Sequence, residues 1–340
     1  MINNNIIVIF GGLSNEHFIS IASAQNIAKA CGPCKCWYWD KNGLVKEICF
    51  YKLIIFKDPL KNNFNINSKK NWLNISQALD SIKNKNVVFF NALHGIGGED
   101  GYVQRLLEKK GLSFTGSGSS ASKLAFKKSK SKKIINNNNI LVAPEIKFRL
   151  KDKQNFFLKL KNFIKKYKKV VFKPDMEGSS LGLIFCKSQK NLTNCLSKIK
   201  GLKKSSYLIE AFIEGLEITV GIVQNKINLK ALSCIEISCR DNCIFNYQAK
   251  YFSVGVNEII PARISKFQMK KAQEIALIAH KLIGCSGYSR TDMIINSKGI
   301  YFLEINTLPG LSDVSLFTKE LAYENISMNN FVKNQLELAC

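Results

Sequence analysis

The passage that most restricts the fold of this chain lies near its carboxyl end, at residues 287–310. Two runs of strand-forming residues, 290–295 and 300–305, flank the sequence Asn-Ser-Lys-Gly at 296–299, which is typical of a tight turn. Runs of this kind on either side of a turn are expected to pair with each other. The passage therefore predicts a β-hairpin.

Four polar side chains interrupt the apolar pattern of this hairpin. Because side chains alternate between the faces of a strand, Arg290 and Asp292 share one face, as do Glu304 and Asn306. Counting back from the turn places Asp292 within about one residue of the position opposite Glu304. Two carboxylates and an amide oxygen suit a hard divalent cation such as Mg²⁺. We predict a metal site here; a strand-end salt bridge from Arg290 is the alternative.

A second polar segment, residues 173–182, is rich in glycine and serine and lies between two predicted strands. Glycines let backbone N–H groups converge on an anion, Ser179 and Ser180 add hydroxyl donors, and Lys173 adds a positive charge. The segment is interpreted as a phosphate-binding loop, although taken alone it also fits an ordinary hairpin turn.

The chain opens with a strand at residues 6–10, a Gly-Gly turn and a helix that starts near Glu16. Such strand-turn-helix units are typical of doubly wound parallel sheets, so the N-terminal region is predicted to be α/β. The Asn- and Lys-rich stretch 57–76 is interpreted as a surface excursion, and 229–237 as a single strand. The short strands from residue 170 onward predict an antiparallel α+β lobe. A length of 340 residues allows two or three such lobes.

The charge balance points to an anionic partner. Lysine and arginine number 50 against 25 acidic residues, a formal net charge of +25, which fits nucleic acid, an anionic membrane or a phosphorylated substrate. In the basic run 151–169, however, the apolar residues recur at helical spacing, so the lysines are expected on the solvated face. No stretch approaches the roughly 20 apolar residues that span a bilayer. Without a signal sequence, a cytoplasmic protein is expected.

Two segments have the spacing of known functional motifs. Cys31-Gly32-Pro33-Cys34 has redox spacing, but it follows a predicted helix and precedes a strand, so a helix stop is the favoured interpretation over a redox or zinc site. Residues 116–121 match a dinucleotide fingerprint, yet the acid expected about 20 residues later is missing. Neither motif is given a function.

Taken together, the ordered motifs closely resemble those of the D-alanine–D-alanine ligases, in the ATP-grasp superfamily. The resembling segments span nearly the whole chain and are Gly11 to His17, Leu93 to Gly101, Phe114 to Gly118, Lys173 to Ser180, Glu210 to Glu217, Tyr247 to Tyr251 and Gly287 to Leu316. One departure is Phe126-Lys127-Lys128, where the family usually has Met-Asp-Lys.

The resemblance implies a three-lobed ATP-grasp fold, α/β and α+β, with an N-terminal doubly wound parallel-sheet domain over 1–127. A central ATP-grasp lobe over 128–217 and a C-terminal one over 218–340 would grip ATP between them. The implied reaction joins two D-alanines to D-alanyl-D-alanine at the expense of ATP, through a D-alanyl phosphate, for peptidoglycan synthesis.

The resemblance also implies roles for individual residues. Those expected to contact ATP are Lys128, Lys173, Ser180, Glu210, Ala211, Phe212, Ile213, Glu217 and Lys250. Those expected in catalysis are Glu16, Ser179, Tyr251, Arg290 and Gly310, with His94, Ser315 and Leu316 on the substrates. Asp292, Glu304 and Asn306 would hold Mg²⁺ or Mn²⁺, with two ions expected.

The expected partners are ATP as co-substrate and D-alanine, without nucleic acid or membrane, in a homodimer. Two rival functions are kept: another carboxylate–amine ligase of the ATP-grasp superfamily, and a basic nucleic-acid-binding protein suggested by the net charge of +25. The first rival is disfavoured by the set Glu16, Tyr251 and Ser315.

Overall fold

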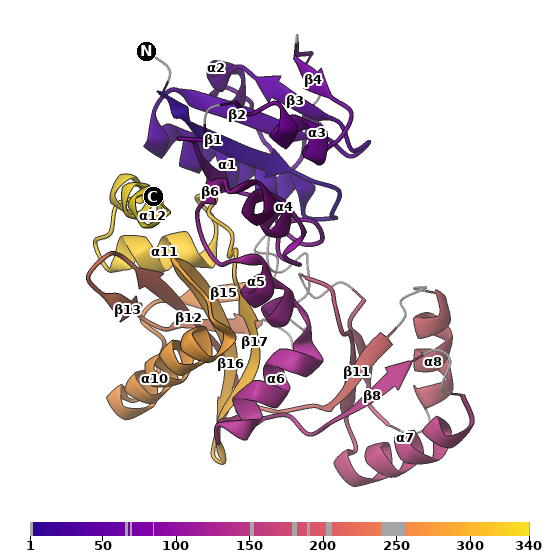
Figure 1. Ribbon diagram of the computed structural model, residues 1–340. Coiled ribbons are helices and arrows are strands. Elements are labelled where there is room, and N and C mark those ends of the chain that lie inside the picture. The colour runs from indigo at the N-terminus through magenta and orange to yellow at the C-terminus, as the bar shows by residue number, and fades with distance from the viewer. Residues whose placement is uncertain are drawn as a thin grey trace.

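The computed structural model describes the chain except for residues 1–2, 65–66, 69, 84, 150–152, 179–181, 189–190, 202–205, 240–255 and 340. Three lobes are visible, each built on its own sheet (Figure 1). Within the described part of the chain, no helix combines the length and the apolar composition needed to cross a membrane.

The N-terminal lobe contains a six-stranded sheet in the order β4-β3-β2-β1-β5-β6. In this order β2, β1, β5 and β6 pair in parallel, and β3 and β4 add an antiparallel edge. Residues 7–10 of the central strand are fully buried, as expected of a strand covered on both faces. The strands are β1 Asn3–Gly11, β2 Cys34–Trp39, β3 Val45–Ile48, β4 Asn71–Trp72, β5 Val88–Asn91 and β6 Ser113–Phe114. The helices are α1 His17–Cys31, α2 Phe50–Ile54, α3 Ile75–Asp80 and α4 Tyr102–Lys110.

Helix α1 ends where the sequence predicted a helix stop. Gly32 follows its last residue with a positive φ of 70°, which glycine adopts without strain, and β2 begins two residues later. Cys31 and Cys34 are free thiols. The interpretation of this motif as a helix stop is therefore confirmed.

The stretch 57–76 is only partly a surface excursion. Phe64 and Trp72 are buried, and Trp72 lies in β4, which pairs with β3. The interpretation of this stretch was therefore wrong at its two aromatic residues. They anchor an otherwise polar segment to the sheet.

The central lobe is an antiparallel sheet of four strands in the order β10-β9-β11-β8. The antiparallel pairing was predicted, but the predicted lobe extended too far, because the strands from residue 216 onward belong to the C-terminal sheet. Its strands are β8 Glu145–Arg149, β9 Val170–Pro174, β10 Ile184–Cys186 and β11 Ser206–Ala211, and its helices are α7 Lys153–Tyr167 and α8 Leu192–Gly201. Leu160, Phe163 and Ile164 of α7 are buried in one core with Phe172 of β9. The basic run is thus an amphipathic helix, and of its described aromatic residues Phe163 is buried and Tyr167 packs partly buried against the same core.

The C-terminal lobe has a sheet in the order β15-β14-β12-β16-β17-β7, with β13 also paired to β12. Its strands are β7 Leu141–Val142, β12 Leu216–Gln224, β13 Leu229–Ala231, β14 Ile235–Cys239, β15 Val256–Ile259, β16 Tyr288–Asn296 and β17 Gly299–Asn306. The remaining helices are α5 Ser119–Phe126, α6 Lys128–Asn137, α10 Lys266–Ile283, α11 Leu316–Tyr323 and α12 Met328–Leu338. Helix α12 packs on α1, so the C-terminal and N-terminal lobes share a core.

The run 229–237 forms two strands rather than the single strand predicted. β13 pairs with residues 222–224 of β12, and β14 pairs with residues 217–219. Between them Leu232 is fully buried and donates its N–H to the Gly221 carbonyl. The local apolar pattern is continuous, but this inward turn interrupts the ladder.

Candidate active site

The predicted hairpin forms, and a β-bulge sets its register. From the turn to Met293, which pairs with Phe302, the ladder is regular. Continued regularly, it would place Asp292 opposite Leu303. The register shifts at this point, so Asp292 lies opposite Glu304 and Arg290 opposite Asn306. Because a one-residue slip moves a side chain to the other face, the bulge brings the acidic side chains of β16 and β17 to one face.

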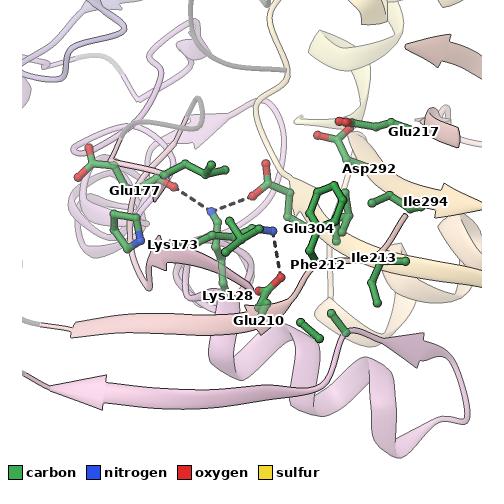
Figure 2. A pocket seen from close by; sticks show the side chains of 16 residues that line it. Lys128, Lys173, Glu177, Glu210, Phe212, Ile213, Glu217, Asp292, Ile294 and Glu304 are labelled. Carbon is green, nitrogen blue, oxygen red and sulfur yellow. Dashed lines mark hydrogen bonds and ion pairs between the residues drawn. The ribbon is translucent and has the colours of Figure 1, made fainter. Parts of the chain in front are cut away.

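The first pocket, here named the inter-lobe pocket, lies between the central and C-terminal sheets (Figure 2). Its walls combine charged side chains with an apolar patch. It is lined by Lys128, Ala143, Val171, Lys173, Pro174, Glu177, Leu183, Glu210, Ala211, Phe212, Ile213, Glu217, Asp292, Ile294, Leu303 and Glu304. The β-bulge presents both Leu303 and Glu304 to this pocket.

A buried ionic cluster forms the floor of the inter-lobe pocket. The Glu210 carboxylate pairs with Lys132 Nζ at 2.6 Å and with Lys173 Nζ at 3.0 Å, and Lys132 also lies 3.6 Å from Glu145. Burial disfavours the charge on Glu210, but the two lysines outweigh it and hold its pKa at about 2. Burial also disfavours the charge on Lys173 and so would lower its pKa, but the nearby carboxylates of Glu210 and Glu304 raise the pKa of Lys173 above its usual value. Glu210 therefore presents an ionised acceptor.

Lys128 connects the two walls of the pocket. Its Nζ pairs with Glu304 Oε2 of β17 and donates to the Glu177 carbonyl, both at 2.8 Å (Figure 2). The adjoining loop is fixed by Asp175, whose carboxylate accepts from the N–H and hydroxyl of Ser129 at the start of α6, each at 2.9 Å. A carboxylate at a helix N-terminus also interacts favourably with the helix dipole. The glycine-rich loop is thus tied to the helix that carries Lys128.

Asp292 is buried and fully engaged by neighbouring donors. Arg290 binds it with two parallel bonds of 3.0 Å from Nε and a terminal nitrogen, and Thr219 Oγ1 donates at 2.6 Å. In this arrangement Arg290 and Lys128 balance the charges of Asp292 and Glu304. Two carboxylates and the amide of Asn306 on one face are oxygen donors of the kind that Mg²⁺ prefers. The residues present therefore fit such an ion.

A second pocket opens between the N-terminal lobe and the end of β17. It shares Glu304 with the inter-lobe pocket and is lined by Glu16, His94, Glu99, Arg290, Glu304, Asn306, Leu308, Pro309, Gly310, Val314, Ser315 and Leu316. Glu16 is buried, and its carboxylate lies against Gly178 of the glycine-rich loop. A Cβ added to Gly178 would lie only 2.4 Å from Glu16 Oε2. A Cβ on Gly310 would lie 2.7 Å from Ser315 Oγ. At both positions a larger residue would displace a side chain of the pocket.

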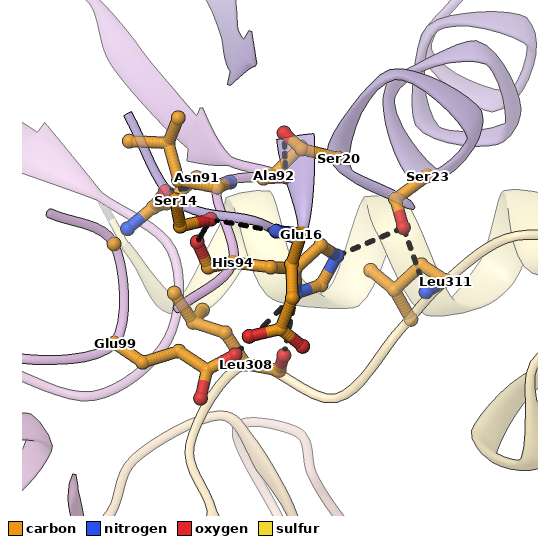
Figure 3. A network of polar contacts seen from close by, with 12 residues as sticks. Ser14, Glu16, Ser20, Ser23, Asn91, Ala92, His94, Glu99, Leu308 and Leu311 are labelled. Carbon is orange, nitrogen blue, oxygen red and sulfur yellow. Dashed lines mark hydrogen bonds and ion pairs between the residues drawn. The ribbon is translucent and has the colours of Figure 1, made fainter. Parts of the chain in front are cut away.

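The floor of the second pocket is a network of hydrogen bonds (Figure 3). Ser14 Oγ donates to the His94 carbonyl at 2.6 Å and accepts the Glu16 N–H at 3.1 Å. The His94 ring bonds Ser23 Oγ and the Leu308 carbonyl, each at 3.0 Å. His94 is thus held between α1 and the loop after β17.

Of the residues predicted from the sequence, every one that the structure describes lines one of these two pockets. Lys128, Lys173, Glu210, Ala211, Phe212, Ile213, Glu217, Asp292 and Glu304 line the inter-lobe pocket. Glu16, His94, Arg290, Glu304, Asn306, Gly310, Ser315 and Leu316 line the second pocket. Ser179, Ser180, Lys250 and Tyr251 lie outside the described residues. The roles of all these residues stay predictions.

Sequence reasoning missed several residues of the site. Lys132 follows Lys128 by four residues, one helical turn, so helical spacing on α6 could have indicated it. Ser23 of α1 lies seven residues after Glu16, the residue that precedes this helix, which is again close to a helical spacing. Leu303 enters the pocket only because of the β-bulge, and no local signal marks it.

Two sheet lobes on either side of a pocket rich in lysines and carboxylates, beside a parallel-sheet lobe, form an ATP-grasp fold. Two solved structures have this fold: the D-alanine–D-alanine ligase from Coxiella burnetii and the VanG D-Ala:D-Ser ligase from Enterococcus faecalis. The first has a TM-score of 0.78 at 24% identity and covers 99% of this chain and 95% of that one. The second has a TM-score of 0.80 at 23% identity and covers 99% and 100%.

Sequence comparison gives the family. The family models of the D-ala D-ala ligase N-terminus and C-terminus match residues 5–117 and 134–337. The D-alanine–D-alanine ligase of Pelagibacter ubique is 37% identical over 330 residues, which is 96% of this chain and 95% of that protein. The chain belongs to the D-alanine–D-alanine ligase family.

Proposed function

We propose that the chain ligates two D-alanines to D-alanyl-D-alanine through a D-alanyl phosphate intermediate, with conversion of ATP to ADP and phosphate. The observation that carries this function is Glu304, which lines both pockets. A side chain common to both would lie between a nucleotide bound in one and an amino acid bound in the other. Membership of the ligase family supports the choice of substrates.

The inter-lobe pocket has suitable groups for each part of ATP. The ionised carboxylate of Glu210 is an acceptor for the adenine amino group, and Phe212 and Ile213 offer apolar surface to the ring. Glu217 would accept from the ribose hydroxyls. Lys128 and Lys173 would neutralise the charge of the phosphates. The backbone N–H groups of the glycine-rich loop would donate hydrogen bonds to the phosphate oxygens.

Asp292, Glu304 and Asn306 would hold Mg²⁺ or Mn²⁺, with two ions expected. When bound, the ions would neutralise charge on the phosphates during transfer. The protein groups around them have a separate task. Arg290 and Thr219 fix the Asp292 carboxylate on the face that Glu304 shares. The ligand set is therefore held in place by groups that bind no metal.

In the first step, a D-alanine carboxylate attacks the γ-phosphorus and the bond to the β-phosphate oxygen breaks, giving D-alanyl phosphate and ADP. Transfer of this kind depends on positioning and charge neutralisation. Glu16 would hold the ammonium of this D-alanine, and His94 lies beside it in the same pocket. Lys128 and Lys173 would stabilise the charge of the transferred group.

In the second step, the amine of another D-alanine attacks the acyl carbonyl, and phosphate leaves when the tetrahedral intermediate collapses. Arg290 and the Gly310 N–H, which line the second pocket, would stabilise the oxyanion of that intermediate. The carboxylate of the second D-alanine would bind Ser315 and the Leu316 N–H at the start of α11, where helix N–H groups lack intrahelical partners.

Other expectations belong to the same proposal. Ser179, Ser180 and Lys250 would complete the phosphate site. Tyr251 and Ser179 would form a latch with Glu16. The lobes would divide at residues 127 and 217, although α5, α6 and β7 pack on the C-terminal sheet. We further propose a homodimer that acts in the cytoplasm, where ATP is available, and supplies peptidoglycan synthesis.

The test is phosphate release by the purified full chain with ATP and Mg²⁺, in the presence of D-alanine, L-alanine or D-lactate. D-Alanine is expected to stimulate release well above the rate without amino acid, and L-alanine is not. A folded protein that releases no phosphate with D-alanine would contradict the proposal. Salt-sensitive binding to nucleic acid in such a preparation would favour the basic nucleic-acid-binding alternative.

A further inference from the structure

A directional chain of hydrogen bonds holds the loop 308–311, which carries Gly310. The Leu311 N–H donates to Ser23 Oγ at 3.1 Å, Ser23 Oγ contacts His94 Nε2 at 3.0 Å, and His94 Nδ1 contacts the Leu308 carbonyl at 3.0 Å (Figure 3). All four residues are nearly fully buried. This series of hydrogen bonds therefore begins at Leu311 and ends at Leu308, on the same short loop.

The partners determine where the protons lie. A carbonyl oxygen only accepts, so His94 Nδ1 must carry the hydrogen that it shares with Leu308. In a neutral ring Nε2 then carries no hydrogen, so Ser23 Oγ, which accepts from Leu311, donates its own hydrogen to Nε2. The neutral tautomer that fits these partners has hydrogen on Nδ1, and the Glu99 carboxylate, 3.6 Å from Nδ1, favours hydrogen on the same atom. Asn26 holds the other side of the loop, donating to the Leu311 carbonyl at 3.0 Å.

We infer that Ser23 and His94, here named the loop clamp, position the Gly310 N–H for the second step of the reaction. Gly310 lies between the two clamped residues, directly after Pro309, whose φ is fixed by its ring. An oxyanion donor contributes most when it is held in place before charge develops. Ser23 is not among the residues that line either pocket, so it is a positioning residue.

The test compares Ser23→Ala with Ser20→Ala. Ser20 lies one turn away on α1, is equally buried, and also makes two hydrogen bonds, from the Gly11 N–H at 2.7 Å and to the Ala92 carbonyl at 2.6 Å. Both variants are expected to lower the thermal midpoint to a similar extent. Only Ser23→Ala is expected to slow dipeptide formation, by about 10- to 100-fold.

Rapid-quench experiments separate the two steps. In Ser23→Ala the first-turnover formation of ADP is expected to keep its rate, while D-alanyl-D-alanine appears slowly. Ser23→Thr keeps the hydroxyl and is expected to form the dipeptide faster than Ser23→Ala. Equal slowing of both steps, or equal rates in Ser23→Ala and Ser20→Ala, would overturn the clamp. Because the inference rests on the proposed function, the wild-type chain is assayed first. Wild-type protein that makes no dipeptide would contradict the function itself.

A second readout does not depend on activity. The chain has 3 histidines, so nitrogen NMR of labelled histidine can resolve each ring. His94 is expected to show hydrogen on Nδ1 and an unprotonated Nε2 that accepts a hydrogen bond, and the Nε2 signal is expected to move in Ser23→Ala but not in Ser20→Ala. Hydrogen on Nε2 in the wild-type protein would overturn the clamp.

Discussion

Asp292→Asn is expected to lower kcat by about three orders of magnitude, equivalent to about 4 kcal/mol. The asparagine keeps the size of the side chain and an oxygen that can accept from Thr219, so the fold should persist. It loses the negative charge that a metal ligand supplies. Binding of Mn²⁺, followed by electron paramagnetic resonance, is expected to weaken in parallel with kcat.

The matched control for this change is Asp80→Asn. Asp80 ends α3, lines neither pocket and pairs with Lys110 on the surface. A surface ion pair of this kind contributes little, so kcat and Mn²⁺ affinity should stay at the wild-type level. Wild-type activity in Asp292→Asn would show that the carboxylate is not a metal ligand.

Arg290→Lys is expected to lower kcat by about 10²- to 10³-fold while the KM for ATP changes little. Lysine keeps the positive charge but lacks the planar fork that bonds both oxygens of Asp292. The new ammonium can serve Asp292 or the oxyanion, but it cannot hold the geometry of both. Because the oxyanion exists only after substrates bind, the loss should fall on kcat.

Arg263→Lys provides a stringent control. Arg263 also binds a buried carboxylate, that of Glu236, through Nε at 3.1 Å and a terminal nitrogen at 2.5 Å, and neither residue lines the two pockets. Substitution there should lower the thermal midpoint without a comparable fall in kcat. Similar kinetic losses in both variants would mean that Arg290 acts through stability and not through the reaction.

Much of the fold could be predicted because local pattern and tertiary context agree. The predicted strand at residues 6–10 lies within β1, and the helix expected to start near Glu16 begins at His17. Predictions failed where a few contacts outweigh the local pattern. Phe64 and Trp72 are buried despite polar neighbours, and Leu232 turns inward and divides an apolar run into two strands.

Some features of the site could likewise be predicted from the sequence, and others could not. Residue type and spacing placed Asp292 and Glu304 opposite each other to within the one residue that turn counting allows. The β-bulge that settles this register has no sequence signature. The partner of Lys132 is Glu210, 78 positions along the chain, so their ion pair depends on how the central sheet meets α6. Pairs of this kind arise from tertiary structure alone.

The most direct test of the account follows the oxygen atoms of the substrate. D-Alanine whose carboxylate carries the heavy isotope of oxygen is incubated with the wild-type chain, ATP and Mg²⁺, and the released phosphate is analysed by mass spectrometry. Attack of the carboxylate on ATP predicts one heavy oxygen in each phosphate, formed together with D-alanyl-D-alanine. Dipeptide formed with unlabelled phosphate, or labelled alanine left unchanged while ATP is hydrolysed, would contradict it.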